Sequence, residues 1–439
     1  MERKISAKLL EWKSKDKKRM PLIISGARQV GKTHILREFG RNYYKNSIYV
    51  NLETNLSVSS LFENDITPDR IIRFLEASFN EAIIPDETLI ILDEIQFCER
   101  ALTSLKYFCE DANEYHVVAA GSLLGVAINR EKYSFPVGKV ETITLYPMNF
   151  EEFLWALQKD KLANIIRENF HMNRCLPEVL HLQALELYKI YLIVGGMPAA
   201  VKRFVDTEKI IEIADIQSNI LNSYIADMAK YAINAESVKI RAAYNSLPNQ
   251  LAKNNKKFQY KVIQKGGNAN LFGSAIEWLI FSGIVLKCQK IEKALMPLAV
   301  YTDLSSFKLY MADTGLLVMK SGLAYQTVLS NLETDNIFLG SLAENYVAQE
   351  LSSNGYPLFY WESKGMSEID FLLQNGEQII PVEVKAGTHT RSKSLSVFVK
   401  KYRPNYSIRI SAKNFGFENQ VKSVPLYAVY NICLTNEHT

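Results

Sequence analysis

The chain has 439 residues, of which 48% are hydrophobic and 22% are charged, and its formal net charge is +4. That length exceeds what one hydrophobic core usually serves, so two or three domains are expected, and the balance of residue types excludes a disordered chain. It also excludes a polycation, so any contact with nucleic acid must come from local patches.

The sequence predicts a cytoplasmic protein with no membrane partner. No stretch approaches the roughly 20 uninterrupted apolar residues that a membrane span needs. The first residues contain neither a continuous apolar segment nor a small-residue cleavage site, so a secretory signal is not expected. The cysteines form no CxxC pair, which favours buried thiols in a reducing compartment over disulfides or a zinc site.

Residues 1–20 predict a basic amphipathic helix. Ile5, Leu9, Leu10 and Trp12 lie near helical spacing among many lysines. Two interpretations stay open: the helix packs its apolar side on the first domain, or it contacts nucleic acid or a membrane.

Residues 21–148 predict an α/β domain with a parallel sheet. Its strand candidates are continuous apolar runs rather than alternating polar and apolar residues, a pattern typical of strands buried on both faces. We therefore expect helices on either side of the sheet. The candidates are PLIISG (21–26), SIYVNLE (47–53), TLIILDE (88–94) and EYHVVAAGS (114–122).

A phosphate-binding motif follows the first candidate strand. Glycines there let backbone N–H groups turn inward around a phosphate, and the N-terminus of the next helix adds its positive dipole end. Lys32 is expected to reach the β- and γ-phosphates of a nucleotide, and the Thr33 hydroxyl to ligate Mg²⁺. The alternative is a glycine turn without a ligand, which the flanking strand and helix disfavour. The residues that match GxxxxGK[ST] are Gly26, Ala27, Arg28, Gln29, Val30, Gly31, Lys32 and Thr33.

A second element supports the first. In LIILDEIQ (89–96), an apolar strand ends in Asp93 and Glu94, which places two acids at the sheet edge where ligands of open α/β folds bind. We expect Asp93 to hold the Mg²⁺ shell and Glu94 to orient or deprotonate the attacking water. A strand followed by Asp-Glu is weak evidence alone, but it becomes strong beside a phosphate loop.

A third strand ends in Gly121-Ser122, where Ser122 either senses the γ-phosphate or caps a helix. With SFPVGKVETITLYPMNFEEFL (134–154) and VGGMPAAV (194–201), these motifs resemble the AAA+-type P-loop ATPases of a prokaryotic class fused to a nuclease domain. The resemblance covers nearly the whole chain. It implies an AAA+-like fold with a helical lid and ATP as the nucleotide.

The same resemblance leaves one role unassigned. Family members often carry arginine where this chain has Lys139. Arg130 and Arg203 are then the candidates for an arginine finger, and the sequence does not choose between them. A ring-forming oligomer and a monomer both stay open for the same reason.

Residues 149–253 read as helical and are assigned to the lid region, with a turn predicted at Gly195, Gly196 and Pro198. Residues 254–325 combine an apolar helix (271–288) with a hairpin-like KLYMADTGLL (308–317). That combination is compatible with a winged helix.

A Lys/Asn-rich segment opens this middle region. It runs through Lys253, Asn254, Asn255, Lys256 and Lys257, with Phe258 and Tyr260 following. Two interpretations stay open: the segment contacts a DNA backbone, or it is a solvated loop.

The last region, residues 326–439, predicts a second α/β unit with its own set of acids. Glu344 lies in a predicted helix, and Asp370 lies in SEIDFLL (367–373) with Glu368 beside it. Glu383 and Lys385 point to the same face of a later strand because side chains alternate. Carboxylates with a lysine make a site for Mg²⁺ or Mn²⁺ that binds a scissile phosphate and activates water.

This pattern resembles the PD-(D/E)xK restriction-endonuclease-like fold. In the resemblance Asp370 is the first acid, Glu383 and Lys385 form the ExK element, and Glu344 matches the acid of the preceding helix; Ile369 replaces the proline of the motif. A surface strand that alternates acid and base explains the ExK element alone equally simply. A catalytic site and an inactive, binding relic are both open.

The leading hypothesis is a Mg²⁺-dependent ATPase coupled to a nuclease-like domain that acts on DNA, in which nucleotide binding repositions the C-terminal part. The alternative is a regulatory or signalling ATPase whose last domain is inactive and only binds a partner or nucleic acid.

Overall fold

The computed structural model describes residues 1–15, 19–63, 65–128, 135–231, 234–253, 256–330, 337–363, 367–388 and 393–434. It divides into two compact units. The N-terminal unit comprises Glu2–Tyr146 with Phe281–Gly283, and the C-terminal unit comprises Met1, Pro147–Ile280 and Ile284–Thr439.

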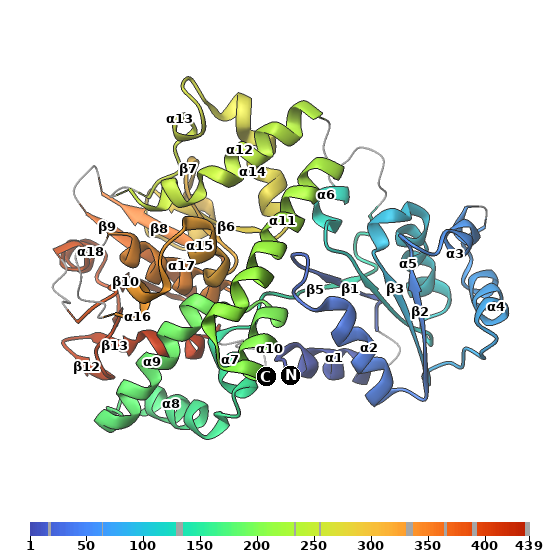
Figure 1. The fold of residues 1–439 in the computed structure, drawn as a ribbon, viewed down its shortest axis with the longest axis horizontal. Helices are drawn as coiled ribbons and strands as arrows, with labels where there is room; N and C mark the ends of the chain where they lie inside the picture. Colours follow the sequence, from blue (N-terminus) through green and yellow to red (C-terminus); the bar gives the residue numbers. More distant parts are fainter. Residues whose placement is uncertain are drawn as a thin grey trace. The chain divides into compact units, whose positions relative to one another are not determined.

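The sheet of the N-terminal unit has five strands in the order β2-β3-β4-β1-β5, and every pair is parallel (Figure 1). This confirms the predicted parallel sheet. Because β4 lies between β1 and β3, the residues after these three strands meet at one edge of the sheet. The elements are α1 (Ile5–Ser14), β1 (Leu22–Ser25), α2 (Lys32–Tyr43), β2 (Asn46–Asn51), α3 (Leu56–Ser59), α4 (Pro68–Phe79), β3 (Thr88–Asp93), α5 (Glu99–Asp111), β4 (His116–Ala120), α6 (Leu124–Ile128) and β5 (Glu141–Thr144).

One strand was not predicted. β5 (Glu141–Thr144) has the sequence ETIT, and its side chains alternate between half-buried and exposed. It pairs only with β1 at the edge of the sheet. An edge strand needs no continuous apolar run, so the pattern used for the other four strands does not detect it.

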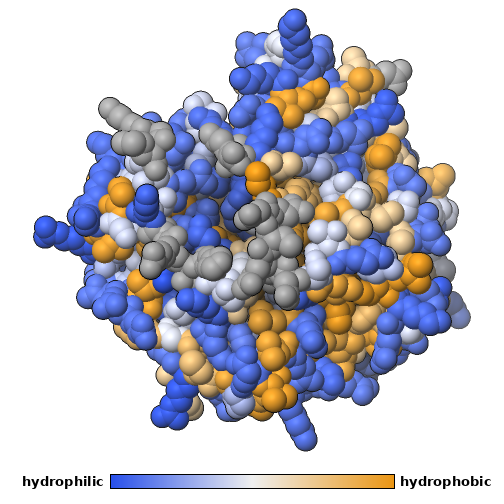
Figure 2. Space-filling view, turned by 60° about the vertical axis from the view of Figure 1, so that its left-hand side comes forward, coloured by the Kyte–Doolittle hydropathy of each residue, from blue (hydrophilic) through white to orange (hydrophobic). Residues whose placement is uncertain are grey.

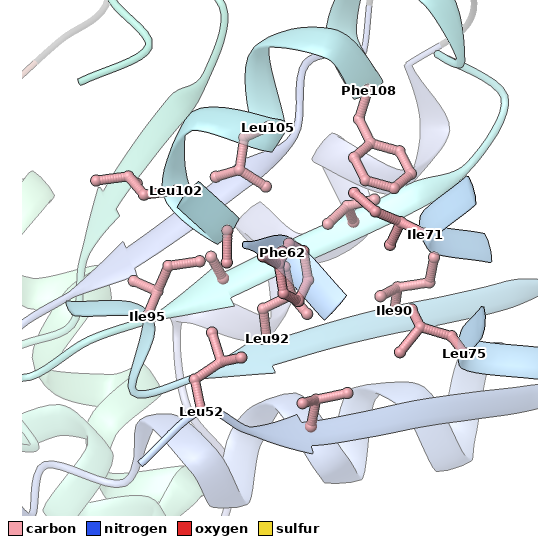
Figure 3. Packing of buried hydrophobic residues seen from close by; sticks show 14 of the residues in the cluster. Leu52, Phe62, Ile71, Leu75, Ile90, Leu92, Ile95, Leu102, Leu105 and Phe108 are labelled. Carbon is pink, nitrogen blue, oxygen red and sulfur yellow. The ribbon is translucent and has the colours of Figure 1, made fainter. Parts of the chain in front are cut away.

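Helices cover both faces of this sheet, as predicted. α1 and α2 lie on one face, and α3, α4 and α5 lie on the other (Figure 1). Alternate residues of β3 point toward the face of the sheet that α4 and α5 cover. There they belong to one cluster of buried hydrophobic residues (Figure 3). The side chains of that cluster drawn around β3 include Ile71, Leu75, Ile90, Leu92, Leu102, Leu105 and Phe108.

The N-terminal helix packs on this unit, which is the first of the two interpretations of residues 1–20. α1 buries Ile5, Leu9 and Trp12, whereas Leu10 is left 38% exposed. The Trp12 ring meets the edge of His116 at the start of β4, and the Trp12 indole donates a hydrogen bond to the Met20 carbonyl at 2.7 Å. The apolar side of α1 is therefore used inside the unit.

The C-terminal unit combines helices with a mixed sheet of eight strands in the order β12-β13-β11-β10-β9-β8-β6-β7. Its helices are α7 (Phe150–Ala156), α8 (Asp160–Met172), α9 (Glu178–Val194), α10 (Pro198–Thr207), α11 (Ala214–Tyr231), α12 (Asn234–Leu251), α13 (Tyr260–Ile263), α14 (Ala269–Phe281), α15 (Thr314–Ser321), α16 (Tyr325–Leu329), α17 (Ile337–Ser353) and α18 (Lys393–Tyr402). Its strands are β6 (Val285–Ile291), β7 (Thr302–Met311), β8 (Phe359–Glu362), β9 (Glu368–Asn375), β10 (Gln378–Val384), β11 (Ser407–Ser411), β12 (Gly416–Glu418) and β13 (Val421–Pro425).

The helices and strands of the middle region, residues 254–325, differ from those predicted. The apolar run 271–288 is not one helix, since α14 ends at Phe281 and β6 begins at Val285. The predicted hairpin over 308–317 is wrong: β7 ends at Met311, and Asp313 caps the new helix α15 by accepting a hydrogen bond from the Leu316 amide at 2.8 Å. β6 pairs with β8, so the strands before and after the predicted boundary at 325 form one sheet.

The predicted glycine turn lies between α9 and α10. Gly195 has φ +71°, and a Cβ there would lie 2.3 Å from Asp313 Oδ1, so only glycine fits. The Gly196 amide donates to Asp313 Oδ2 at 2.6 Å. Asp313 thus ties this turn to the start of α15.

We expect Asp313 to make the free energy of unfolding depend on pH. Burial raises its pKa from 3.8 to about 6, against the backbone amides of Leu316, Gly196 and Gly315, which favour the charged form. Between those pH values the folded chain keeps a proton that the unfolded chain has released, so the free energy of unfolding falls as pH rises. We expect wild type to lose about 2 kcal/mol relative to Asp313→Asn between pH 4 and pH 7, measured by denaturant unfolding. An unchanged difference across this range would contradict the assignment.

No helix among the described residues is long and apolar enough to cross a membrane. The exposed large hydrophobic side chains are scattered over several elements, for example Val179, Ile211 and Leu304. The face drawn in Figure 2 shows hydrophobic residues that lie among hydrophilic ones.

Candidate functional site

The loop between β1 and α2 is built around two glycines. Gly26 has φ +141°, and a Cβ there would lie 2.2 Å from the Leu145 carbonyl oxygen. Gly31 has φ +97° and precedes the first turn of α2. Side-chain-bearing residues rarely adopt these angles, so the two glycines set the path of the loop. Between them, Gln29 is exposed with φ +68°, Arg28 is half-buried, and Val30 is buried.

Lys32 closes this loop from inside. Its Nζ donates hydrogen bonds to the carbonyls of Gly26 and Ala27, both at 2.8 Å, and the residue is only 6% exposed. A positive charge is therefore held in the curve of the loop, at the N-terminus of α2, where the helix dipole also favours an anion.

The hydroxyl of Thr33 meets the acid of the distant strand β3. Thr33 Oγ1 donates to Asp93 Oδ2 at 2.7 Å, across 60 positions of sequence. The predicted Mg²⁺ ligands, Thr33 and Asp93, are thus adjacent. A hydroxyl and a carboxylate are ligand types that Mg²⁺ prefers, so these residues fit the metal expected beside a nucleotide.

Tyr49 joins this pair and was not predicted. Its hydroxyl donates to Asp93 Oδ2 at 2.8 Å. Burial, and then the hydrogen bond to Asp93, raise the pKa of Tyr49 to about 12, so it stays a donor at neutral pH. Asn51 pairs in register with Asp93, and Tyr49 shares a strand face with Asn51. The strand order that brings them together is not readable from sequence.

Glu94 is held at the next position by two neighbours. Its Oε2 accepts a hydrogen bond from Gln96 Nε2 at 2.5 Å and from Ser122 Oγ at 3.4 Å. Its backbone is left-handed, with φ +52°, an uncommon conformation for a residue other than glycine. Ser122 follows β4, so the sheet order brings it beside Glu94, while its choice between γ-phosphate sensor and helix cap stays open.

Neither predicted arginine-finger candidate lies among the described residues of the N-terminal unit. Arg130 lies outside the described residues. Arg203 is on α10 of the C-terminal unit, with its NH1 4.0 Å from a carboxylate oxygen of Glu212. Lys139, where the related family often has arginine, pairs with Glu110 at 2.9 Å within the N-terminal unit.

The acids of the C-terminal unit form a separate, buried cluster. Glu344 Oε1 pairs with Lys256 Nζ, and its Oε2 accepts from the Tyr310 hydroxyl at 3.2 Å and lies 3.8 Å from Lys308 Nζ. Lys308 has no exposed side-chain surface and also pairs with Glu368.

The other two predicted acids have different partners. Asp370 Oδ2 accepts a hydrogen bond from the Val384 amide at 2.8 Å. Glu383 Oε1 pairs with Lys385 Nζ at 2.7 Å, which agrees with their predicted place on one strand face. The structure therefore brings Glu383 and Lys385 into contact, and Asp370 lies next to them on β9.

Charge in this cluster is distributed unevenly. Burial opposes ionisation of Glu344, but Lys256 and Lys308 hold its pKa below the usual value. Burial, with the neighbouring carboxylates Glu344 and Glu383, raises the pKa of Asp370 well above its usual value.

The divalent metal implied by the nuclease-like resemblance does not fit these acids as they are arranged. Within the described ranges, no group of three or more His, Cys, Asp and Glu side chains is placed to hold a metal ion. Lysine ammonium groups supply the counter-charge to Glu344 and Glu383 instead.

The burial of two residues in the Lys/Asn-rich segment bears on its two interpretations. Lys256 points into the acid cluster with 14% of its side chain exposed, and Phe258 is buried. These two residues are therefore turned largely into the fold, and whether the rest of the segment contacts a DNA backbone stays a prediction. Asn254 and Asn255 lie outside the described residues.

Three family models match successive parts of the chain. Residues 18–154 match the family described as AAA domain. The N-terminal part of the chain is thus similar to AAA domains, and its parallel sheet is of the P-loop NTPase type. Residues 185–327 and 339–429 match domains of unknown function, DUF8612 and DUF4143, and neither description names an activity. The coarse prediction of an AAA-type P-loop domain is confirmed, whereas the restriction-endonuclease-like fold is not shown.

Several solved structures match the chain at low identity and with low TM-scores. A Walker-type ATPase of Pyrococcus abyssi is 13% identical, with 73% of this chain and 95% of that chain covered and a TM-score of 0.43. The ORC2 protein of Aeropyrum pernix is 13% identical, with 77% and 93% covered and a TM-score of 0.33. RuvB of Thermotoga maritima is 11% identical, with 67% and 89% covered and a TM-score of 0.31. These likenesses are too remote to bear on function, and no curated protein matches the chain.

Proposed function

We propose that the N-terminal unit binds ATP with Mg²⁺ and hydrolyses it. The observation that carries this proposal is the 2.7 Å hydrogen bond from Thr33 Oγ1 to Asp93 Oδ2, because it joins the phosphate loop to the acidic end of β3. Neither Thr33 nor Asp93 alone is specific to a nucleotide site. A Mg²⁺-nucleotide site needs a threonine that follows Gly-Lys and contacts an acid, and here that acid directly precedes Glu94.

In this proposal each side chain of the phosphate site has its own role. The backbone amides of residues 26–33 and the Lys32 ammonium bind the phosphates, and Thr33 and Asp93 hold the metal, with Tyr49 orienting Asp93. When bound, Mg²⁺ supplies positive charge that offsets the charge developing on the phosphates. Glu94 takes up a proton from the attacking water, and Gln96 and Ser122 keep its carboxylate in place.

The experiment is phosphate release from ATP by the purified chain, with Mg²⁺ and with EDTA. We expect release that needs Mg²⁺. Phosphate release at the same rate in EDTA would exclude this Mg²⁺-nucleotide site as the source of the hydrolysis.

For the C-terminal unit, we propose the second function predicted from sequence, a domain that binds a partner or nucleic acid without cutting it. Its support is the pairing of Glu344 and Glu383 with lysines. The competing function is a Mn²⁺- or Mg²⁺-dependent nuclease acting on DNA, with Asp370, Glu383 and Lys385 as its catalytic set and Glu344 as a further ligand.

Plasmid nicking separates the two functions. With Mn²⁺ present, we expect no nicking by wild type, by Asp370→Ala or by Glu383→Ala. Nicking by wild type that disappears in both variants would restore the nuclease function. Equal nicking in all three proteins would indicate a contaminant.

A further inference from the structure

Arg3 is a buried charged residue of the N-terminal unit that the mechanism proposed above does not use. It lies just before α1 and is only 6% exposed. A guanidinium is costly to bury unless acceptors meet its N–H groups, so the acceptors indicate what the residue does. One nitrogen, NH1, donates to the Val30 carbonyl at 3.2 Å, and the other, NH2, donates to the Tyr146 carbonyl at 2.8 Å. Arg3 therefore joins the phosphate loop to the segment that follows β5.

The hydrogen bond to Val30 sets the direction of one peptide group in the phosphate loop. In a trans peptide the carbonyl oxygen and the N–H of the next residue point to opposite sides. While Arg3 holds the Val30 carbonyl, the Gly31 N–H therefore points away from Arg3. The Gly31 amide donates no hydrogen bond to any residue that the structure describes. It is thus a free donor directly before α2, where a phosphate would be bound.

This peptide group needs a partner because the backbone around it is easily turned. Gln29 has φ +68° and Gly31 has φ +97°. Glycine adopts positive and negative φ about equally well, so the peptide that precedes Gly31 can rotate at little steric cost. A rotated peptide would direct the Val30 carbonyl oxygen, instead of the Gly31 N–H, toward an anion.

Arg3 is itself held in place from two sides. The helix that follows it buries Ile5 and Leu9 in the N-terminal unit. Its second acceptor belongs to a segment tied to the sheet, since the Leu145 amide donates to the Ser25 carbonyl at the end of β1, at 2.8 Å. The guanidinium therefore connects the Val30 carbonyl to the framework of β1 and β5.

We propose that Arg3 is a positioning residue of the phosphate site, which keeps the Gly31 amide turned toward the phosphates by holding the Val30 carbonyl on the opposite side. The inference rests on the proposed function, because it needs a nucleotide in the loop. Arg3 does not touch the nucleotide and acts only through the peptide group between Val30 and Gly31.

The affinity for a non-hydrolysable ATP analogue with Mg²⁺ gives the first test. Arg3→Met removes the donors but keeps an unbranched side chain. We expect its dissociation constant to rise at least about tenfold, because one hydrogen bond to a charged phosphate is lost. Arg3→Lys keeps a charged donor for the Val30 carbonyl and should bind more tightly than Arg3→Met. Lys8→Met, which removes an exposed lysine of α1, is the matched control and should bind as wild type does.

Nuclear magnetic resonance of the Gly31 amide separates this role from a general loss of structure. Labelling valine with ¹³C at the carbonyl and glycine with ¹⁵N selects the amides of Gly31, Gly138 and Gly195, the three glycines that follow a valine. In wild type we expect the bound analogue to shift the Gly31 proton downfield, as a hydrogen bond to an anion does. In Arg3→Met at saturating analogue this shift should fall to less than half, with the Gly138 and Gly195 signals unchanged.

The results that count against this inference differ from those that count against hydrolysis. Wild-type affinity in Arg3→Met, an Arg3→Lys that binds no more tightly than Arg3→Met, or a full Gly31 shift in Arg3→Met would overturn the role of Arg3 alone. If Arg3→Met does not fold, wild type still decides, because a Gly31 proton that does not move at saturating analogue would overturn the role. A wild type that binds the analogue but releases no phosphate from ATP would contradict the proposed hydrolysis only. Failure of wild type to bind the analogue would overturn both.

Discussion

Replacing Glu94 by glutamine should stop ATP turnover while leaving ATP bound. The glutamine side chain keeps the size of the carboxylate and a contact with Gln96, but it cannot accept a proton from water. We expect kcat for phosphate release to fall by about 10² to 10⁴, the usual contribution of a general base. The dissociation constant for ATP should stay within about threefold of wild type, because Glu94 does not bind phosphate in this account.

The matched control is Glu114→Gln. Glu114 is exposed and precedes β4, at the opposite edge of the sheet from Glu94. Its variant should hydrolyse ATP at the wild-type rate. Unchanged kcat in Glu94→Gln would remove Glu94 from the mechanism, and equal loss of binding would make it a phosphate or metal ligand instead.

Replacing Lys32 by alanine should instead weaken nucleotide binding. The ammonium holds the loop closed through Gly26 and Ala27 and supplies the positive charge in its curve. A hydrogen bond to a charged group is worth about 1.5–3 kcal/mol. We therefore expect the dissociation constant for ATP to rise about 10- to 100-fold, measured by titration with a fluorescent ATP analogue, and hydrolysis to fall with it.

Lys45→Ala serves as the control for lost positive charge. Lys45 lies in the same unit, with its side chain 73% exposed and paired with Glu87. A surface pair contributes little, so this variant should bind and hydrolyse ATP normally. Hydrolysis untouched by Lys32→Ala would make the phosphate-site assignment wrong.

The proposed nucleotide site can be predicted from sequence because its residues form local motifs. Gly26 to Thr33 are contiguous, and Asp93 and Glu94 end a strand whose apolar run is plain in the sequence. The contact of Tyr49 with Asp93 depends on β2 lying next to β3. The position of Ser122 beside Glu94 likewise depends on the placing of β4, and no local pattern encodes strand order.

The C-terminal unit shows more clearly what sequence motifs leave undetermined. Motif spacing placed Glu383 and Lys385 together, since Glu383 lies near the end of β10 and Lys385 directly follows that strand. It did not foresee that Lys308 and Lys256 would neutralise Glu344, because those lysines come from β7 and from a loop. An acid's partners decide whether it can hold a metal, and those partners are set by tertiary packing.

The most direct test of the nucleotide site is a crystal structure with a non-hydrolysable ATP analogue and Mg²⁺. The account predicts the triphosphate against the backbone amides of residues 26–33, and the metal in contact with Thr33 Oγ1 and the Asp93 carboxylate. A nucleotide bound elsewhere, or a metal that touches neither residue, would contradict it.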